Sequence, residues 1–136
     1  LIGFAQALTD HGLPLRPEYV VRARLDPESA RAETEALLMG DDPPDAIYAV
    51  TASLTLGSSQ ALRTTGQAAN LGMVGQDDDR WASLVQPAVS VIQQPTTQMG
   101  KVAAAQLLRR VGGDDGPAAS IVMEPKLVVR ESSLRR

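Results

Sequence analysis

Residues 46–76 read AIYAVTASLTLGSSQALRTTGQAANLGMVGQ, and this stretch decides the fold. It opens on the apolar run 46–50, which is typical of a parallel strand that is covered on both faces. Residues 52–65 carry their apolar side chains at helical spacing and stop near Gly66. A second short apolar run, 71–75, predicts another buried strand. A strand, a helix and a strand in this order predict one βαβ unit of a parallel sheet.

The alternation of helices and strands continues on both sides of this unit. Asp26-Pro27-Glu28 favours a helix start, because Asp26 can cap the helix and Pro27 suits its first turn. Further strands are predicted over 19–25, 89–92, 121–123 and 127–129, and further helices over 1–11 and 99–111. Strands separated by helices of about 10–15 residues indicate a parallel sheet with helices on both faces. The predicted fold class is therefore α/β, a three-layer αβα lobe on a Rossmann-like parallel sheet.

The composition excludes several kinds of chemistry. The chain has 136 residues, no Cys and one His, His11. Disulfides, thiolate catalysis and Cys-ligated zinc are therefore excluded, and a His-cluster metal site or a His-dependent triad has too few members. The net charge of −3 argues against the chain holding a phosphate backbone by itself, and no window approaches the roughly 18 apolar residues of a membrane span. We therefore expect no metal, no cofactor, no enzymatic activity and no membrane partner.

A binding site is expected at one edge of the predicted sheet. Parallel sheets bind ligands at the carboxyl ends of their strands, which here carry Thr51-Ala52 and Gln76-Asp77. The acidic run 77–79 has three possible functions: binding the hydroxyl groups of a ligand, holding Mg²⁺, or forming a solvated turn. Three neighbours in one loop cannot all point the same way, and no distant acidic ligand is identifiable. These two facts disfavour the metal.

The chain begins in an unusual way. Residues 1–4 read LIGF, without an initiator Met, and already follow the spacing of a buried helical face with no capping residue before it. We therefore expect this sequence to be a piece of a longer protein.

Five short motifs follow one another along the chain. They are GF-x-x-AL-x-x-x-G over 3–12, AIYAVT over 46–51, VGQDD over 74–78, P-x-VSVI-x-QP-x-x-x-MG over 87–100 and LVVRES over 127–132. Their ordered set resembles the effector-binding domain of the lactose-repressor (LacI/GalR) family of bacterial transcription regulators. The resemblance covers essentially the whole chain.

The resemblance implies a periplasmic-binding-protein-like fold, in which two lobes close on a small ligand, commonly a sugar or nucleobase. Residues 1–92 would form the C-terminal lobe. Residues 93–122 would form a returning segment that packs with the N-terminal lobe, and residues 123–136 the closing strand and C-terminal tail. Most of the N-terminal lobe, a DNA-binding helix-turn-helix domain and an arginine expected just before Leu1 lie outside this sequence.

The resemblance also implies partners. A small-molecule effector, sugar-like or nucleoside-like, would bind between the lobes, and operator DNA would bind through the domain that this chain does not include. The family's effector lobes dimerise, which implies a homodimer with Leu56 and Val85 in its interface. A regulator of this kind is expected in the cytoplasm, with the effector acting allosterically as the signal for repression or activation.

Four residues fall on ligand-contacting positions of the family. Asp77 occupies the position that accepts a hydrogen bond from a ligand hydroxyl. Thr51 stands where Asn is usual and keeps only a hydroxyl. Gln76 replaces the usual aromatic residue, and Thr96 lies where some members place a stacking Phe. Ala52, which replaces an Asp, has no polar side chain, and these departures together put ordinary hexose recognition in question.

Three functions remain open at this point. The ordered motifs and the lack of catalytic residues favour the effector-binding part of a ligand-responsive regulator. A solute-binding transport protein for a sugar-like ligand would share the fold but act outside the cytoplasm. An enzyme on an α/β sheet is the third possibility, and turnover that depends on Asp77 would support it.

Overall fold

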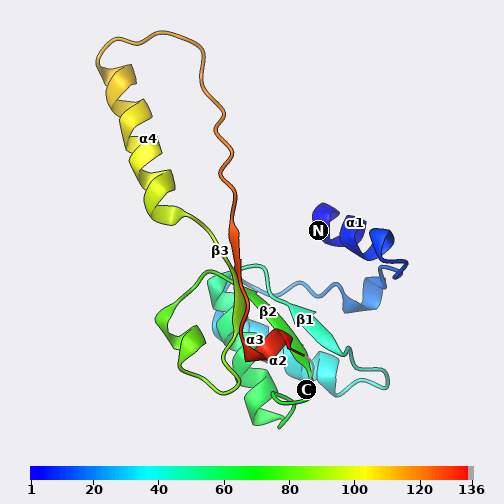
Figure 1. Cartoon of the computed structure of the whole chain (residues 1–136). Coiled ribbons are helices and arrows are strands. Elements are labelled where there is room, and N and C mark those ends of the chain that lie inside the picture. Colours follow the sequence, from blue (N-terminus) through cyan, green and yellow to red (C-terminus); the bar gives the residue numbers. More distant parts are fainter. Residues whose placement is uncertain (135–136) are drawn as a thin grey trace.

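The computed structural model describes residues 1–134 of the chain, which form a lobe with a long arm projecting from it (Figure 1). We call residues 27–93 together with 126–134 the lobe, and residues 94–125 the arm. The α-helices and strands are α1 (Ile2–Asp10), α2 (Pro27–Leu38), β1 (Ala46–Tyr48), α3 (Ala52–Thr64), β2 (Gly72–Gln76), β3 (Ser90–Gln93), α4 (Thr96–Val111) and β4 (Lys126–Val128). Three short 3₁₀ helices are η1 (Pro17–Tyr19), η2 (Arg80–Ser83) and η3 (Glu131–Ser133).

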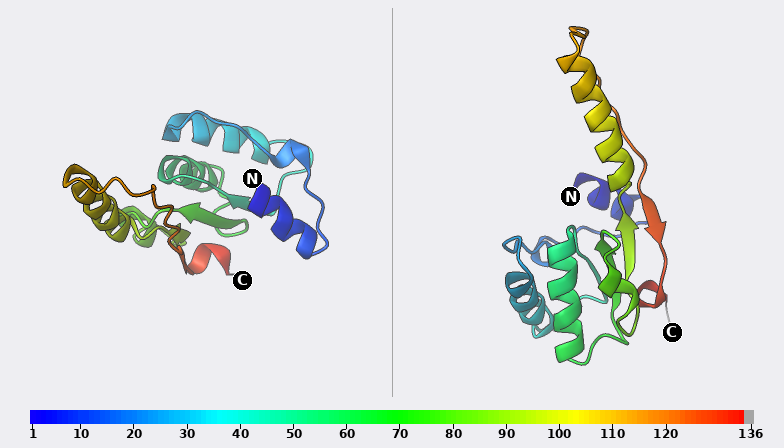
Figure 2. Two further views of the ribbon diagram at one scale, coloured as in Figure 1. Left: turned by 90° about the horizontal axis from the view of Figure 1, so that it is seen from above. Right: turned by 90° about the vertical axis from the view of Figure 1, so that its left-hand side faces the viewer.

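The four strands form one sheet in the order β1-β2-β3-β4. β1, β2 and β3 are parallel, with Tyr48 opposite Val74 and Gln76 opposite Ile92, whereas β4 runs antiparallel to β3. The two segments that connect the parallel strands, one of them containing α3, are part of the lobe. α2 and α3 stack together on one side of the sheet (Figure 2). The predicted α/β class with a parallel sheet is confirmed.

Small side chains allow the helices to approach the sheet and each other closely. A Cβ on Gly57 of α3 would lie 2.1 Å from the carbonyl oxygen of Pro27, so a larger residue would force α2 and α3 apart. A Cβ on Gly75 of β2 would lie 2.1 Å from Cγ2 of Thr55, so α3 lies directly on β2. The buried hydroxyls of Thr34 and Ser58 form a 2.9 Å hydrogen bond between α2 and α3, which satisfies two polar groups that burial would otherwise penalise.

The core lies between α3 and the sheet. Its buried apolar residues are Ala49, Leu62, Leu71, Met73, Ala82, Val89 and Val91. None of them is aromatic, although the partly buried Trp81 packs against this cluster. The last residues of the described chain close this core by hydrogen bonding: the Ser132 hydroxyl donates to the Met73 carbonyl at 2.6 Å and accepts from the Ser90 N–H at 2.8 Å.

The prediction of a strand over 19–25 is wrong. The structure has η1 at Pro17–Tyr19 and no regular element from there to α2. The segment forms no ladder along the edge of β1, and its backbone hydrogen bonds are local, such as that from the Arg24 N–H to the Ser29 hydroxyl at 3.1 Å. The segment instead turns directly into the predicted cap of α2, where the Asp26 carboxylate accepts from the Ser29 N–H at 2.8 Å.

Two further strand predictions need correction. β1 is not covered on both faces, since Tyr48 at its end is 37% exposed, and Val50 just after it is 55% exposed. No strand forms over 121–123, because β3 ends at Gln93, and its last residue pairs with Lys126 at the start of β4. The chain before Lys126 therefore has no strand opposite it.

The arm leaves the sheet after β3 as α4 and returns in an extended run to β4 (Figure 1). α4 has no buried residue, and Leu107 and Val111 of its predicted inner face are 64% and 78% exposed. Among the described residues this apolar face has no partner. No helix of residues 1–134 is long and apolar enough to cross a membrane.

Candidate ligand-binding site

Polar side chains lie together at the carboxyl edge of the parallel strands, because the ends of neighbouring strands lie side by side. Thr51 follows β1, Asp77 follows β2, and Gln94 follows β3. Thr51 caps α3, because its hydroxyl accepts from the Leu54 N–H at 3.3 Å. The hydroxyl of Thr51 is therefore engaged in holding the start of the helix.

Asp77 has an unusual backbone conformation, with φ at +64°. Asp tolerates this left-handed conformation better than most residues do. Its N–H donates to the Ile92 carbonyl at 3.0 Å, and its Oδ1 accepts from the Gln94 side-chain amide, also at 3.0 Å. Its second carboxylate oxygen accepts no hydrogen bond from residues 1–134, so it is the oxygen that remains able to accept a ligand donor.

The next carboxylate in the same loop has a structural function. Asp78 forms a salt bridge with Arg130, with oxygens 2.7 Å and 2.9 Å from the guanidinium, and both side chains are about one-fifth exposed. Arg130 also donates to the Val89 carbonyl at 2.9 Å, which ties the acidic loop to the closing segment of the chain. Within the described part of the chain, no cluster of three or more His, Cys, Asp or Glu side chains is placed to hold a metal ion.

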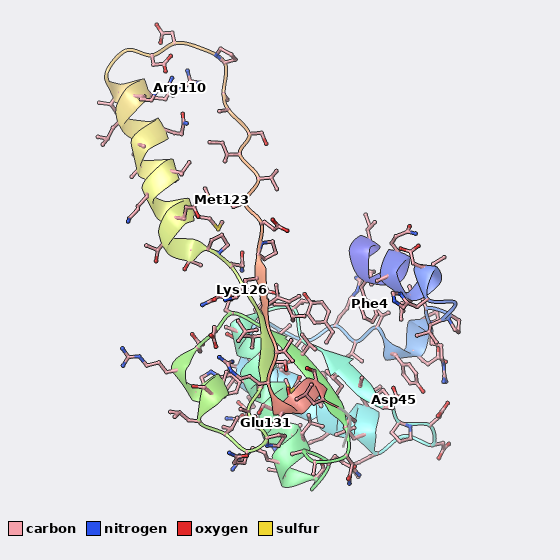
Figure 3. The ribbon with its side chains drawn as sticks, in the orientation of Figure 1. Phe4, Asp45, Arg110, Met123, Lys126 and Glu131 are labelled. Atoms are coloured by element: carbon pink, nitrogen blue, oxygen red, sulfur yellow. The ribbon has the colours of Figure 1, made fainter. Side chains whose placement is uncertain are left out.

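A groove of about 670 Å³ lies between this edge and the arm. The lobe contributes Tyr48, Gln76 and Ile92 to its lining, and the arm contributes the rest, including Gln94, Gln106 and the apolar Met123 (Figure 3). The Tyr48 hydroxyl donates to the Gln76 side-chain oxygen at 3.3 Å. The ring of Phe4 from α1 stacks on Tyr48 with ring centres 6.1 Å apart.

The four predicted ligand residues are not equivalent in this structure. Gln76 lines the groove, whereas Asp77 lies next to it and is hydrogen-bonded to Gln94, which does line it. Thr51 and Thr96 are not in the lining, and Thr96 is exposed at the first turn of α4. The assignment of these residues to a ligand therefore stays a prediction.

Two residues of the groove are missed by sequence reasoning. Tyr48 falls in the run that predicts a fully covered strand, but the alternation of side chains along β1 places it on the opposite face from Ile47. Gln94 follows the carboxyl end of β3, and the edge rule that identifies Thr51 and Asp77 would identify it too.

The two predicted dimer-interface residues are both half-buried. Leu56 lies on α3, and Val85 packs against the core. Next to Val85 in the sequence, the apolar side chain of Leu84 is 80% exposed. The interface itself stays a prediction.

A separate charged cluster fastens the N-terminal segment to the turn before β1. The Arg16 guanidinium lies 2.8 Å from both the Glu18 and the Asp42 carboxylates and 4.2 Å over the Tyr19 ring. The hydrogen bond from Arg16 lowers the pKa of Asp42 below its ordinary value. The pKa of Glu18 is lowered too, first by a backbone hydrogen bond and then by Arg16. This cluster lies outside the groove lining.

A mostly parallel sheet with polar side chains at its carboxyl edge beside a groove defines an α/β ligand-binding lobe. Residues 1–133 match the periplasmic binding protein-like domain, and the chain belongs to this family. Its curated relatives include the ribose operon repressor of Haemophilus influenzae, 30% identical over 97% of this chain, and the repressor PurR of Yersinia pestis, 30% identical over 96%. The resemblance to the LacI/GalR regulators is thereby confirmed.

Solved structures give the same result. The complex of the transcriptional regulator CelR with cellobiose is similar with a TM-score of 0.87 and 29% identity, covering 96% of this chain and 41% of that one. A LacI-family regulator from Sanguibacter keddieii has a TM-score of 0.88 and 26% identity, covering 96% of this chain and 51% of that one. The chain spans about 40% of the length of the curated relatives.

Proposed function

We propose that this chain is the effector-binding portion of a ligand-responsive transcription regulator. The observation that carries the proposal is the similarity to such regulators over nearly the whole chain, including one solved with cellobiose. The names of the curated relatives favour a regulator over a transport protein or an enzyme, because they are repressors. A regulator of this kind acts in the cytoplasm.

The effector is a small, hydroxyl-rich molecule such as a sugar or nucleoside. The free carboxylate oxygen of Asp77 would accept a hydrogen bond from a ligand hydroxyl, and a charged acceptor makes such a bond stronger. Gln76 would donate from its amide nitrogen, because its oxygen already accepts from Tyr48. Thr51 and Thr96 would contact the ligand once the second wall of the site is in place.

The arm and the surface of the lobe have separate partners in this proposal. Residues 93–122 pack with a second lobe that this chain does not include, which would cover the exposed apolar face of α4. Two copies pair through the surface around Leu56 and Val85, and operator DNA binds through a separate domain. An effector that favours one arrangement of the lobes then shifts DNA affinity by its own difference in affinity for the two arrangements, typically about 1–3 kcal/mol.

Calorimetry on the full-length product of the gene tests the proposal. It should be titrated with a panel of sugars and nucleosides that begins with cellobiose and ribose. Asp77→Ala should weaken the hit at least about tenfold, because a hydrogen bond to a charged group is lost. Asp79→Ala, an exposed carboxylate two residues away, should leave affinity within about twofold.

Two results would contradict the proposal. Unchanged affinity in Asp77→Ala would show that the site assignment is wrong. A secretory signal ahead of Leu1, in place of a helix-turn-helix domain, would show that the protein is not a regulator.

A further inference from the structure

The arm is joined to the lobe by very few interactions. Its two ends continue into β3 and β4, where Gln93 pairs with Lys126. Between these ends, within the described residues, one side-chain hydrogen bond connects residues 94–125 to the rest of the molecule, and it runs from Gln94 to Asp77. The other side-chain hydrogen bonds of the arm stay inside it, at the tip around Asp114.

The residue that makes this contact lies at the root of the arm. Pro95 follows Gln94 and limits its backbone to extended conformations, and the Thr96 N–H donates back to the Gln94 carbonyl at 2.9 Å. α4 begins at the next residue, Thr96. Gln94 therefore lies two residues before the helix, so the hydrogen bond of its side chain to Asp77 restrains the point at which the arm leaves the lobe.

The hydrogen bond from Gln94 is accepted by Asp77, whose carboxylate can reorient more freely than that of Asp78. Asp78 is held on both oxygens by Arg130 and cannot turn without breaking a partly buried ion pair. Asp77 is fixed through its backbone N–H, but its side chain is held by Gln94 on one oxygen. The orientation of the Asp77 carboxylate and the position of Gln94 therefore depend on each other.

We propose that Gln94 is a positioning residue that couples the orientation of the Asp77 carboxylate to the position of the arm. In the absence of a ligand, the hydrogen bond holds the arm in one orientation over the lobe. The regulatory consequence rests on the proposed function: a ligand donor bound by Asp77 and a displacement of the arm would influence each other equally, because coupling between two equilibria is reciprocal.

Distance measurements by pulsed electron paramagnetic resonance test the coupling without any ligand. The chain has no Cys, so Gln60→Cys on α3 and Ala105→Cys on α4 provide two unique, exposed positions for spin labels. We expect the unsubstituted and Gln93→Ala backgrounds to share one distance distribution. Gln94→Ala and Asp77→Ala should broaden or shift it, whereas Asp77→Asn, which keeps an acceptor oxygen, should not.

Gln93→Ala is the matched control, since Gln93 is an exposed glutamine next in sequence whose side chain makes no hydrogen bond in the described structure. A Gln94→Ala distribution identical to that of Gln93→Ala would overturn the proposal. If Gln94→Ala fails to fold, the comparison of Asp77→Ala with Asp77→Asn decides the same question, and identical distributions in those two variants would overturn the proposal as well.

Titration of the full-length protein with sugars and nucleosides separates this proposal from the proposed function. With a sugar that binds, Gln94→Ala should change the affinity about tenfold and Gln93→Ala less than twofold. If the label distances change as expected but no sugar or nucleoside binds, the coupling stands and the proposed function fails. If a sugar binds through Asp77 but the distances do not change, the coupling fails and the proposed function stands.

Discussion

α3 in the lobe and α4 in the arm carry apolar residues at the same helical spacing, yet they are buried to opposite extents. α3 buries six residues against β2 and α2, including Ala61 and Leu62, whereas α4 buries none. A helix of 16 residues gains little stability from its own hydrogen bonds. The difference in burial therefore comes from the elements that pack against each helix. Periodicity identifies the face of a helix that packs, and the partner decides whether it is buried.

The largest expected difference between the lobe and the arm is in the stability lost when an apolar side chain is truncated. Met73 is 2% exposed, and Met73→Ala should lower the free energy of unfolding by about 2–5 kcal/mol, because it removes buried surface and leaves a cavity. Leu107→Ala on α4 should change it by less than about 0.5 kcal/mol. Urea denaturation of both variants measures this, and a similar loss in the two would show that α4 packs on the lobe.

A smaller difference in stability is expected when an ion pair of the lobe and one of the arm are broken. Arg130→Ala should cost about 2–3 kcal/mol of unfolding free energy, because it leaves the Asp78 carboxylate and the Val89 carbonyl without their donor in a partly buried place. Arg109→Ala breaks the exposed pair with Asp114 at the tip of the arm and should cost less than about 1 kcal/mol. Thermal denaturation compares the two, and equal losses would contradict a structural role for the Arg130 pair.

The smallest effect concerns the attachment of the N-terminal segment and its pH dependence. The pKa of Asp42 is lowered in the folded chain, so its ion pair with Arg16 contributes at pH values above the ordinary Asp pKa of about 3.9. That contribution is lost as the pH falls through the lower, folded-state value. The ring resonances of Tyr19 in NMR spectra should therefore shift on acidification below about pH 4.

Two variants check this assignment. Asp42→Asn should produce the shift of the Tyr19 resonances already at pH 7, and Asp41→Asn should not. A titration of Tyr19 that is unchanged in Asp42→Asn would mean that another group holds the segment.

The central elements of the fold can be predicted from the sequence because their signals are local. Asp26 and Pro27 mark the start of α2, and the apolar run before Gln76 marks β2. The segment 19–25 has the residues of a strand but no ladder in this chain, and a ladder depends on a neighbour that local sequence cannot show. The wrong strand prediction over 121–123 has the same cause.

The candidate site can be predicted in position but not in detail. The rule for parallel sheets places Thr51 and Asp77 at one edge, and they lie there. The sequence does not predict that Asp78, rather than Asp77, pairs with Arg130, because Arg130 lies 52 residues further along the chain. The same rule could place Gln94 at this edge, but its hydrogen bond to Asp77 appears only when β2 and β3 are paired.

Amide hydrogen exchange, residue by residue, tests most directly the claim that the lobe is a folded unit whose arm has its partner outside this chain. The measurement should compare the 136-residue chain with the full-length gene product. We predict that the amides of β3 exchange slowly in both, and that the amides of α4 exchange faster in this chain than in the full-length protein. Equal protection of α4 in the two, whether strong or weak, would contradict this claim.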